Sequence, residues 1–308
     1  MNDIRTERLE WVDTARIPAM LFVIIQHIPL VCPWNDSPLT SSLAFFMLLA
    51  GYFAGPRLAA SPQVWSGYAG RRVVKLMGPY LAWNAIYLAG MLVTGEEPLP
   101  ATLTEWAHVF GLGHEPLLLP LWFIRDLAVF MIVGSFLVRG PCWVLVAAAL
   151  AGLCFLPVGA GGEFWPKPHM FGNFCLGMLA AGVPGLSGHW KALPIGFHFG
   201  IVAFYFCLAG YSAYAGGVVY GPLTVPGILA LLSMGILLDR LPCRRMLQTC
   251  SRGTFFIFCF HTFVIVALKF VLPVGSFWWL AAVPVIYGAS LVVYLLIRRW
   301  SIFRFLTC

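Results

Sequence analysis

Long apolar runs alternate with short polar connections from one end of the chain to the other. Most of these runs are close to the length of about 20 residues with which an α-helix crosses the hydrocarbon core of a bilayer. The pattern predicts ten membrane-spanning helices, over residues 14–32, 39–55, 74–94, 119–138, 142–158, 168–184, 193–212, 221–238, 253–272 and 276–297. We therefore expect an all-α, polytopic membrane protein that forms a single integral-membrane domain over residues 1–308.

The composition supports lipid as the solvent of this chain. Hydrophobic residues make up 60% of it and charged residues only 10%, with a mean hydropathy of +0.87. Soluble domains carry roughly 25% charged residues, so this composition excludes a soluble globular domain. The net charge of +7 comes mostly from basic residues near the helix ends, which is typical of membrane anchoring. We expect no nucleic-acid partner.

The basic residues predict the orientation of the helices, because cytoplasmic loops carry an excess of Lys and Arg. With the N-terminus placed inside, 16 of the 19 Lys and Arg residues fall on the cytoplasmic side, all except Arg125, Lys167 and Lys269. An odd number of spans would divide the basic residues between the two sides. The distribution favours ten spans with both termini in the cytoplasm.

The longest outer connection, residues 95–118, carries acids and histidines instead: Glu96, Glu97, Glu105, His108, His114 and Glu115. Its centre, LTEWAHVFGL, is predicted to lie as an amphipathic helix on the outer surface. A solvated cap and a lid that binds an acceptor substrate are both open readings of this connection.

One titratable ring lies in the middle of the first apolar run, in the stretch DTARIPAMLFVIIQH that ends at His27. Arg16 precedes His27 by eleven residues, so the two side chains leave a helix within about 20° of each other, about 16 Å apart along its axis. If Arg16 marks the cytoplasmic interface, His27 lies near the middle of a hydrocarbon core about 30 Å thick. Asp13, three residues before Arg16, is expected to pair with it.

Burial in hydrocarbon favours the neutral form of the His27 imidazole, which is the form that a general base needs. The alternative is a structural histidine that makes a hydrogen bond to another helix. Ionisable residues at this depth are functional by default, so we favour a catalytic role for His27.

A second polar group interrupts the fourth apolar run, in LPLWFIRDLAVF. Arg125 and Asp126 are adjacent and point about 100° apart, so we expect that they do not pair with each other. Each then needs a partner on another helix or a wet cavity, because an unpaired charge in the bilayer costs at least ~2.5–3.5 kcal/mol. A structural ion-pair network and a catalytic role remain equally open.

A third polar position is His261, in the stretch SRGTFFIFCFHTF. Counted from Arg252 at the cytoplasmic edge, His261 lies about 13 Å into the membrane, close to the depth of His27. The two imidazoles and the Arg125–Asp126 group are therefore predicted to share one central layer. Lys269, higher on the same helix, is expected to extend outward to the membrane surface.

The third apolar run begins with a basic cluster, in RRVVKLMGPY. Arg71, Arg72 and Lys75 either anchor the helix at the cytoplasmic side or cradle a polyanionic ligand such as the phosphates of coenzyme A. The sequence leaves both readings open.

Taken together, these stretches resemble the integral-membrane acyltransferase family 3. The first helix of that family has an aspartate and then an arginine followed by ten residues and a histidine, as DTARIPAMLFVIIQH does. The other similar stretches are FFMLLAGYFAG, in which Ala50 stands where serine is common, RRVVKLMGPY, LPLWFIRDL and TFFIFCFH. They follow in the family's order, and the resemblance covers about residues 8–300.

The resemblance implies transfer of an acyl group, often acetyl from acetyl-CoA, to a hydroxyl of a carbohydrate or lipid-linked glycan acceptor in the cell envelope. It implies a multi-pass protein of the bacterial inner membrane that uses acyl-CoA as donor and no metal. His27 would be the essential histidine and Arg16 its motif partner. The family's Arg-x-x-Arg corresponds to Arg72 and Lys75, and an ammonium at the second position lacks the bidentate geometry of a guanidinium.

In the expected mechanism, Arg71, Arg72 and Lys75 bind the donor's phosphates, and His27 takes the proton of the acceptor hydroxyl. Arg125 stabilises the developing oxyanion, while Asp126 or His261 orients its neighbours. An acyl-histidine relay is an open variant. The competing class is a transporter in which the buried His, Arg and Asp residues form a substrate or proton pathway, and a structural membrane subunit is a third reading.

Overall fold

The structure is a computed structural model that describes residues 9–29, 41–61, 63–65, 67–94, 99–111, 119–154, 166–214, 220–300 and 306. Within these ranges the chain forms thirteen α-helices, one short 3-10 helix and no strand. The all-α prediction is confirmed. Each of the ten predicted apolar segments coincides with a helix: α1 (Glu10–His27), α2 (Ser41–Ala60), α3 (Tyr68–Thr94), α5 (Trp122–Leu137), α6 (Cys142–Cys154), α7 (Pro168–Ala181), α9 (Ile195–Tyr214), α10 (Tyr220–Asp239), α12 (Thr254–Lys269) and α13 (Trp278–Ile297).

Several of these helices are long and apolar enough to cross a membrane. Among the described residues, α2, α3, α9 and α13 meet this criterion alone. Two bent pairs raise the number to as many as six: α7 with α8 (Leu186–Ala192), at 90°, and α11 (Arg244–Ser251) with α12, at 71°. The chain is therefore a multi-pass helical membrane protein. The count of ten spans and the side of the termini stay predictions.

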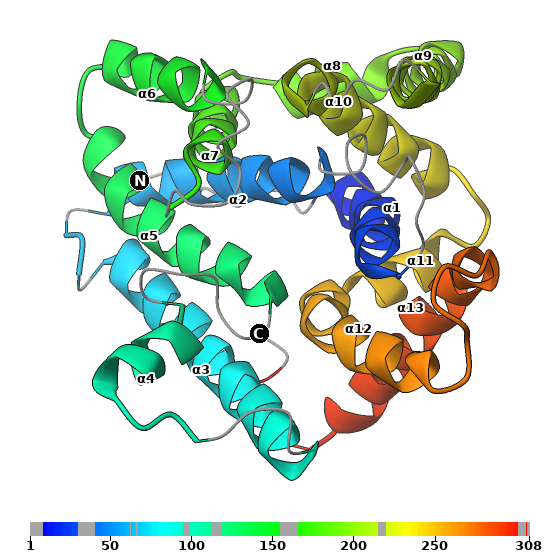
Figure 1. Cartoon of the computed structure of the whole chain (residues 1–308). Coiled ribbons are helices and arrows are strands. Elements are labelled where there is room, and N and C mark those ends of the chain that lie inside the picture. Colours follow the sequence, from blue (N-terminus) through cyan, green and yellow to red (C-terminus); the bar gives the residue numbers. More distant parts are fainter. Residues whose placement is uncertain are drawn as a thin grey trace.

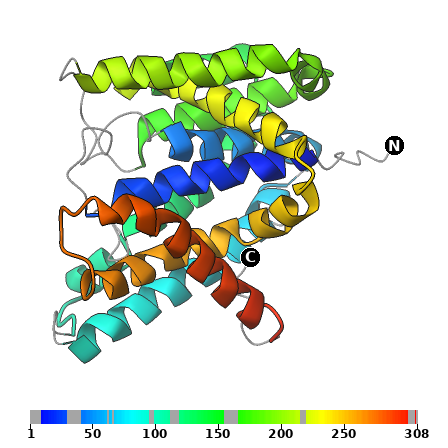
Figure 2. The ribbon, with the colours of Figure 1, turned by 90° about the vertical axis from the view of Figure 1, so that its right-hand side faces the viewer.

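The helix α1 lies at the centre of the arrangement. It packs against α2, α10, α11, α12 and α13, and in Figure 2 it runs between α9 above and α3 below. On one side of it, α2 packs on α7, and α7 on α6 (Figure 1). The pairs α3–α5 and α12–α13 complete the bundle. The N-terminal half of α1 and the ends of α2, α3 and α12 thereby face a common space.

The contact between α2 and α7 depends on glycine. A Cβ atom at Gly51 of α2 would overlap the backbone carbonyl of Phe174 in α7, and one at Gly177 of α7 would overlap that of Leu48 in α2. The two helix backbones approach so closely that only hydrogen fits between them, as is common where membrane helices associate.

The predicted amphipathic helix in the outer connection is present as α4 (Leu103–Val109). Its first turn is closed by a capping box, in which Thr102 accepts from the backbone N–H of Glu105 and Glu105 accepts from that of Thr102. The backbone N–H of Ala101 also donates to Glu105, at 2.6 Å, and these bonds lower the pKa of that carboxyl. The predicted positions Glu96, Glu97, His114 and Glu115 lie outside the described residues.

Candidate functional site

A cavity of about 780 Å³ opens between α1, α2, α3, α5 and the α11–α12 junction. We call it the basic cavity, because six cationic side chains line it: Arg16, Arg57, Arg71, Arg72, Lys75 and Arg252. Asp13 is the single acid in this lining, and it forms an ion pair with Arg16 at 3.1 Å. The predicted Asp13–Arg16 pair is thus confirmed. The cavity carries a strong net positive charge and suits a polyanionic ligand.

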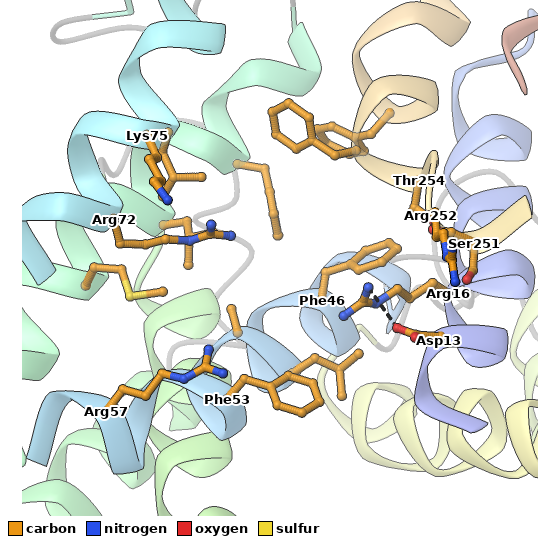
Figure 3. Close-up of a pocket in the computed structure, with 18 of the residues that line it drawn as sticks. Asp13, Arg16, Phe46, Phe53, Arg57, Arg72, Lys75, Ser251, Arg252 and Thr254 are labelled. Carbon is orange, nitrogen blue, oxygen red and sulfur yellow. Dashed lines mark hydrogen bonds and ion pairs between the residues drawn. The ribbon is translucent and has the colours of Figure 1, made fainter. Parts of the chain in front are cut away.

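The cations come from two facing walls (Figure 3). Arg57, Arg72 and Lys75 lie on one wall, and Arg16 and Arg252 lie on the other. Phe46 and Phe53 of α2 lie between the walls. Cationic side chains on two facing walls can bind an extended anion from both sides. The aromatic side chains between the walls offer an apolar surface to the rest of the ligand.

The structure brings Arg16 together with the predicted cluster Arg71, Arg72 and Lys75. It adds Arg57 and Arg252, which sequence reasoning had assigned only to membrane orientation. Both follow or precede an apolar run on the predicted cytoplasmic side, like every other anchoring arginine. The positions of Arg57 and Arg252 in the sequence therefore do not distinguish an arginine that lines a cavity from one that anchors a helix at the membrane surface.

The two predicted histidines meet. The ring centroids of His27 and His261 lie 5.0 Å apart, with an angle of 75° between the ring planes. His261 has no exposed surface, whereas His27 is half-buried. The prediction that the two imidazoles share one depth is confirmed, because α1 and α12 pack side by side.

In each of these rings Nδ1, the ring nitrogen nearer the backbone, makes a hydrogen bond to a backbone carbonyl of the same helix. Nδ1 of His27 lies 2.7 Å from the carbonyl oxygen of Val23, and Nδ1 of His261 lies 3.1 Å from that of Ile257. A carbonyl oxygen only accepts, so in both rings Nδ1 carries the hydrogen and donates. In the neutral rings Nε2 then has the lone pair, and Nε2 of His261 has no hydrogen-bond partner among the described residues. The arrangement leaves Nε2 of either ring as the nitrogen that can accept a proton, and His27 is the more exposed of the two.

A row of aromatic rings connects the basic cavity to the histidines. Phe46, Phe123 and Phe258 line the cavity, and Phe258 also contacts His261, with ring centroids 6.3 Å apart. Neither histidine is part of the cavity lining. Phe258 therefore links the cavity lining to the histidine pair.

The expectation for Arg125 and Asp126 is wrong in one respect, because the two side chains do pair. Arg125 Nη2 and Nε lie 3.1 Å and 3.2 Å from Oδ1 of Asp126, and both side chains are buried. They lie in the first turn of α5, where the flexible arm of Arg125 folds back to its neighbour. The expected angle of about 100° between adjacent residues of a helix describes the directions of their Cα–Cβ bonds. It does not account for the length of the arginine side chain.

Each residue of this ion pair also has a backbone partner in a connection between helices, where a partner on another helix or a wet cavity was expected. Arg125 Nη1 donates to the backbone carbonyl of Gly111, and Asp126 Oδ2 accepts from the backbone N–H of Lys167 at 3.0 Å. The ammonium of Lys167 lies 4.1 Å above the Trp122 ring. The pair thus ties the connections around Gly111 and Lys167 to α5. It is not part of the cavity lining.

Lys269 is exposed at the end of α12, in agreement with its predicted outward position. Among the described residues, no group of three or more His, Cys, Asp or Glu side chains is arranged to hold a metal ion. The expectation of a metal-free reaction stays a prediction.

Comparison with known protein families gives a match over almost the whole chain. A family model described as an acyltransferase domain, the third family of that name, matches residues 9–299. No curated protein and no solved structure matches the chain.

Proposed function

The chain belongs to acyltransferase family 3, and from this membership we propose that it transfers an acyl group, acetyl foremost, from acyl-CoA to a hydroxyl group. The acceptor we propose is a carbohydrate or lipid-linked glycan of the cell envelope. As a membrane acyltransferase the protein sits in a lipid bilayer. We place it in the bacterial inner membrane with the basic cavity open to the cytoplasm, because acyl-CoA is a cytoplasmic compound.

The basic cavity is the observation that carries this proposal. Coenzyme A has a diphosphate and a separate phosphate on its ribose, and the cavity offers cations on two facing walls. A volume of about 780 Å³ lies within the range of sites for cofactors of this size. Arg71, Arg72 and Lys75 bind phosphate on one wall, with Arg57 beside them. Arg16 and Arg252 bind phosphate on the other.

His27 acts as the general base. Its Nε2 takes the proton of the acceptor hydroxyl while the hydroxyl oxygen attacks the thioester carbonyl carbon. The carbon–sulfur bond then breaks, and the leaving thiolate of coenzyme A takes the proton from His27. The bond from Nδ1 to Val23 keeps the ring in the tautomer that this step needs.

The remaining predicted residues position this centre. His261 packs its ring against that of His27 and limits its rotation. Arg125 and Asp126 hold the outer connections through Gly111 and Lys167. Their contacts favour this anchoring role over stabilisation of an oxyanion beside His27.

A transporter is the competing class, and the family membership counts against it. The two classes differ in whether coenzyme A is consumed. Protein purified in detergent is incubated with acetyl-CoA carrying a radiolabelled acetyl group and with envelope glycan as acceptor. Label in the glycan together with release of free coenzyme A supports the enzyme. Movement of substrate across reconstituted vesicles without coenzyme A release would contradict it.

The donor site is tested by Arg72→Ala, with Arg299→Ala as matched control. Arg299 is an exposed arginine at the end of α13 and is absent from the cavity lining. A charge-assisted hydrogen bond is worth about 1.5–3 kcal/mol, so Arg72→Ala should raise the KM for acetyl-CoA by about 10-fold or more. Arg299→Ala should leave it unchanged. Equal KM values for the two variants would remove Arg72 from the donor site.

A further inference from the structure

The inner end of the basic cavity is closed by rings from three helices. Along α2, Arg57 stands at the cationic end and Phe46 is the lining residue furthest from it, about 16 Å away. Along α12, Phe258 lies beyond Thr254 on the way to His261. Along α5, Phe123 is the lining residue furthest from the end of that helix at Leu137. Each of these helices thus places a phenylalanine at the same, inner end.

Phe123 contacts both of the other rings. The ring centroids of Phe46 and Phe123 lie 6.3 Å apart, and those of Phe123 and Phe258 lie 5.5 Å apart. We call Phe46, Phe123 and Phe258 the aromatic floor. Phe258 is almost fully buried and its ring packs against that of His261. The ring of Phe258 therefore has little freedom to move. The wall above the floor is apolar, formed by Leu49, Ala50, Leu127 and Met131.

The inner position of the floor suits the acyl group of the donor. The long pantetheine arm separates the phosphates of coenzyme A from its thioester, and Phe46 lies about 16 Å from Arg57 along α2. A donor whose phosphates are held at the cationic end brings its acyl group to the floor.

We propose that the aromatic floor sets the acyl specificity of the enzyme, by leaving room beside the thioester for an acetyl group and excluding chains of four or more carbons. This inference rests on the proposed function, since it assigns the donor's acyl group to the inner end of the basic cavity. One methylene too many in a close-fitting apolar pocket changes kcat/KM by about 10–200-fold. The two extra methylenes of butyryl-CoA should therefore be rejected strongly.

The test compares kcat/KM for acetyl-CoA and butyryl-CoA, using thioesters labelled in the acyl group and the same glycan acceptor. The wild-type enzyme should prefer acetyl-CoA by at least about 10-fold. Phe258→Leu, Phe123→Leu and Phe46→Leu shorten the floor one ring at a time and should each reduce this preference by about 10-fold or more. Phe136→Leu, a change on the exposed side of α5, is the matched control and should keep the wild-type ratio.

The ratio is insensitive to a general loss of folded protein, because both donors are measured on the same preparation. If the wild-type enzyme uses both thioesters equally, or if folded floor variants keep its preference, the floor does not set specificity, while the proposed function stands. If no thioester is turned over and acetyl-CoA does not bind, the proposed function fails and the inference falls with it. Should all three variants fail to fold, equal use of the two thioesters by the wild-type enzyme would still overturn the inference.

Discussion

At the scale of single residues, the most informative contact is the one between His27 and His261. Sequence reasoning placed both rings at one depth from their distances to Arg16 and Arg252. The structure confirms this with ring centroids 5.0 Å apart. The position of a residue along a helix axis follows from the rise per residue, which is a local property of the helix. The level of each histidine can therefore be predicted from its distance in sequence to an arginine at the helix end. Whether two rings at one depth face each other depends on the rotation of α1 and α12, and no local pattern reports it.

The assignment of His27 as general base predicts that His27→Ala abolishes acyl transfer, by at least about 100-fold, since positioned general bases contribute about 10²–10⁴-fold. His189→Ala is the matched control. His189 makes the same contact from Nδ1 to a carbonyl four residues earlier, at 2.8 Å, but is exposed on α8. Transfer of label from acetyl-CoA measures both variants. Activity retained in inserted His27→Ala protein would remove the assignment.

The buried pair of Arg125 and Asp126 predicts a strong and non-additive effect on stability. Arg125→Met leaves the Asp126 carboxylate buried without its cation and should cost about 3–5 kcal/mol. The double variant Arg125→Met, Asp126→Leu removes both charges and should recover a large part of that loss. Thermal unfolding in detergent, followed by tryptophan fluorescence, gives the comparison. Equal Tm values for the single and double variants would show that the pair does not act as a unit.

At the scale of elements, the ends of the helices were predicted to within six residues, because apolar runs and polar connections are marked in the sequence. The largest difference is at α3, which begins at Tyr68 and not at residue 74. The short helices α8 and α11 were not predicted. They meet their neighbours at bends of 90° and 71°, and a bend depends on what the helix packs against. The segment LTEWAHVFGL was recognised because its polar and apolar positions follow the helical period.

The close approach of α2 and α7 predicts that a single methyl group at their contact is costly. Gly177→Ala places a Cβ against the backbone of Leu48 in α2 and should destabilise the fold by about 1–3 kcal/mol, the usual cost of overpacking. Gly200→Ala on α9 is the control, because nothing lies within 4 Å of its Cβ position. Its Tm in detergent should equal or exceed that of the wild type. A Gly177→Ala variant as stable as Gly200→Ala would contradict the close contact.

The capping box of α4 predicts a pH dependence that is confined to that helix. Hydrogen bonds from the Ala101 and Thr102 backbone lower the pKa of Glu105, so its contribution is present above the pKa of the unfolded chain, about 4.3. It is lost as the pH falls through the lower, folded pKa. Amide exchange in α4, corrected for intrinsic rates, should lose protection over that acid range. In Glu105→Gln the protection should not change with pH, and a parallel change in both proteins would disprove the role of the carboxylate.

At the scale of the whole molecule, the basic cavity joins residues from α1, α2, α3 and the α11–α12 junction at one end of the bundle. The outer connection with α4 is predicted to lie at the opposite side of the membrane. In the proposed reaction, a cytoplasmic donor and an outer acceptor would then approach one centre from two sides without coenzyme A crossing the bilayer. The basic cavity and α4 should therefore be reached by reagents from opposite compartments.

Single cysteines test this orientation in a variant whose native cysteines are replaced by serine. Leu103→Cys on α4 and Leu241→Cys between α10 and α11 both occupy exposed positions. A membrane-impermeant thiol reagent added to intact cells should label position 103, and position 241 should react only after lysis. Labelling of both positions in intact cells would overturn the predicted topology.

The sequence by itself determined the class of the protein: the apolar runs, the helices they form, the basic residues at their ends and the common level of His27 and His261 along the bundle. These features follow from local rules, namely the cost of burying polar groups in lipid and the rise of a helix. Only the tertiary structure decided which side chains meet. Arg57 and Arg252 join the cavity, Arg125 pairs with Asp126, and the aromatic floor closes, because each depends on how helices distant in the chain are rotated and packed. Helix packing is set by the fit of many side chains at once, and no single stretch of sequence contains it.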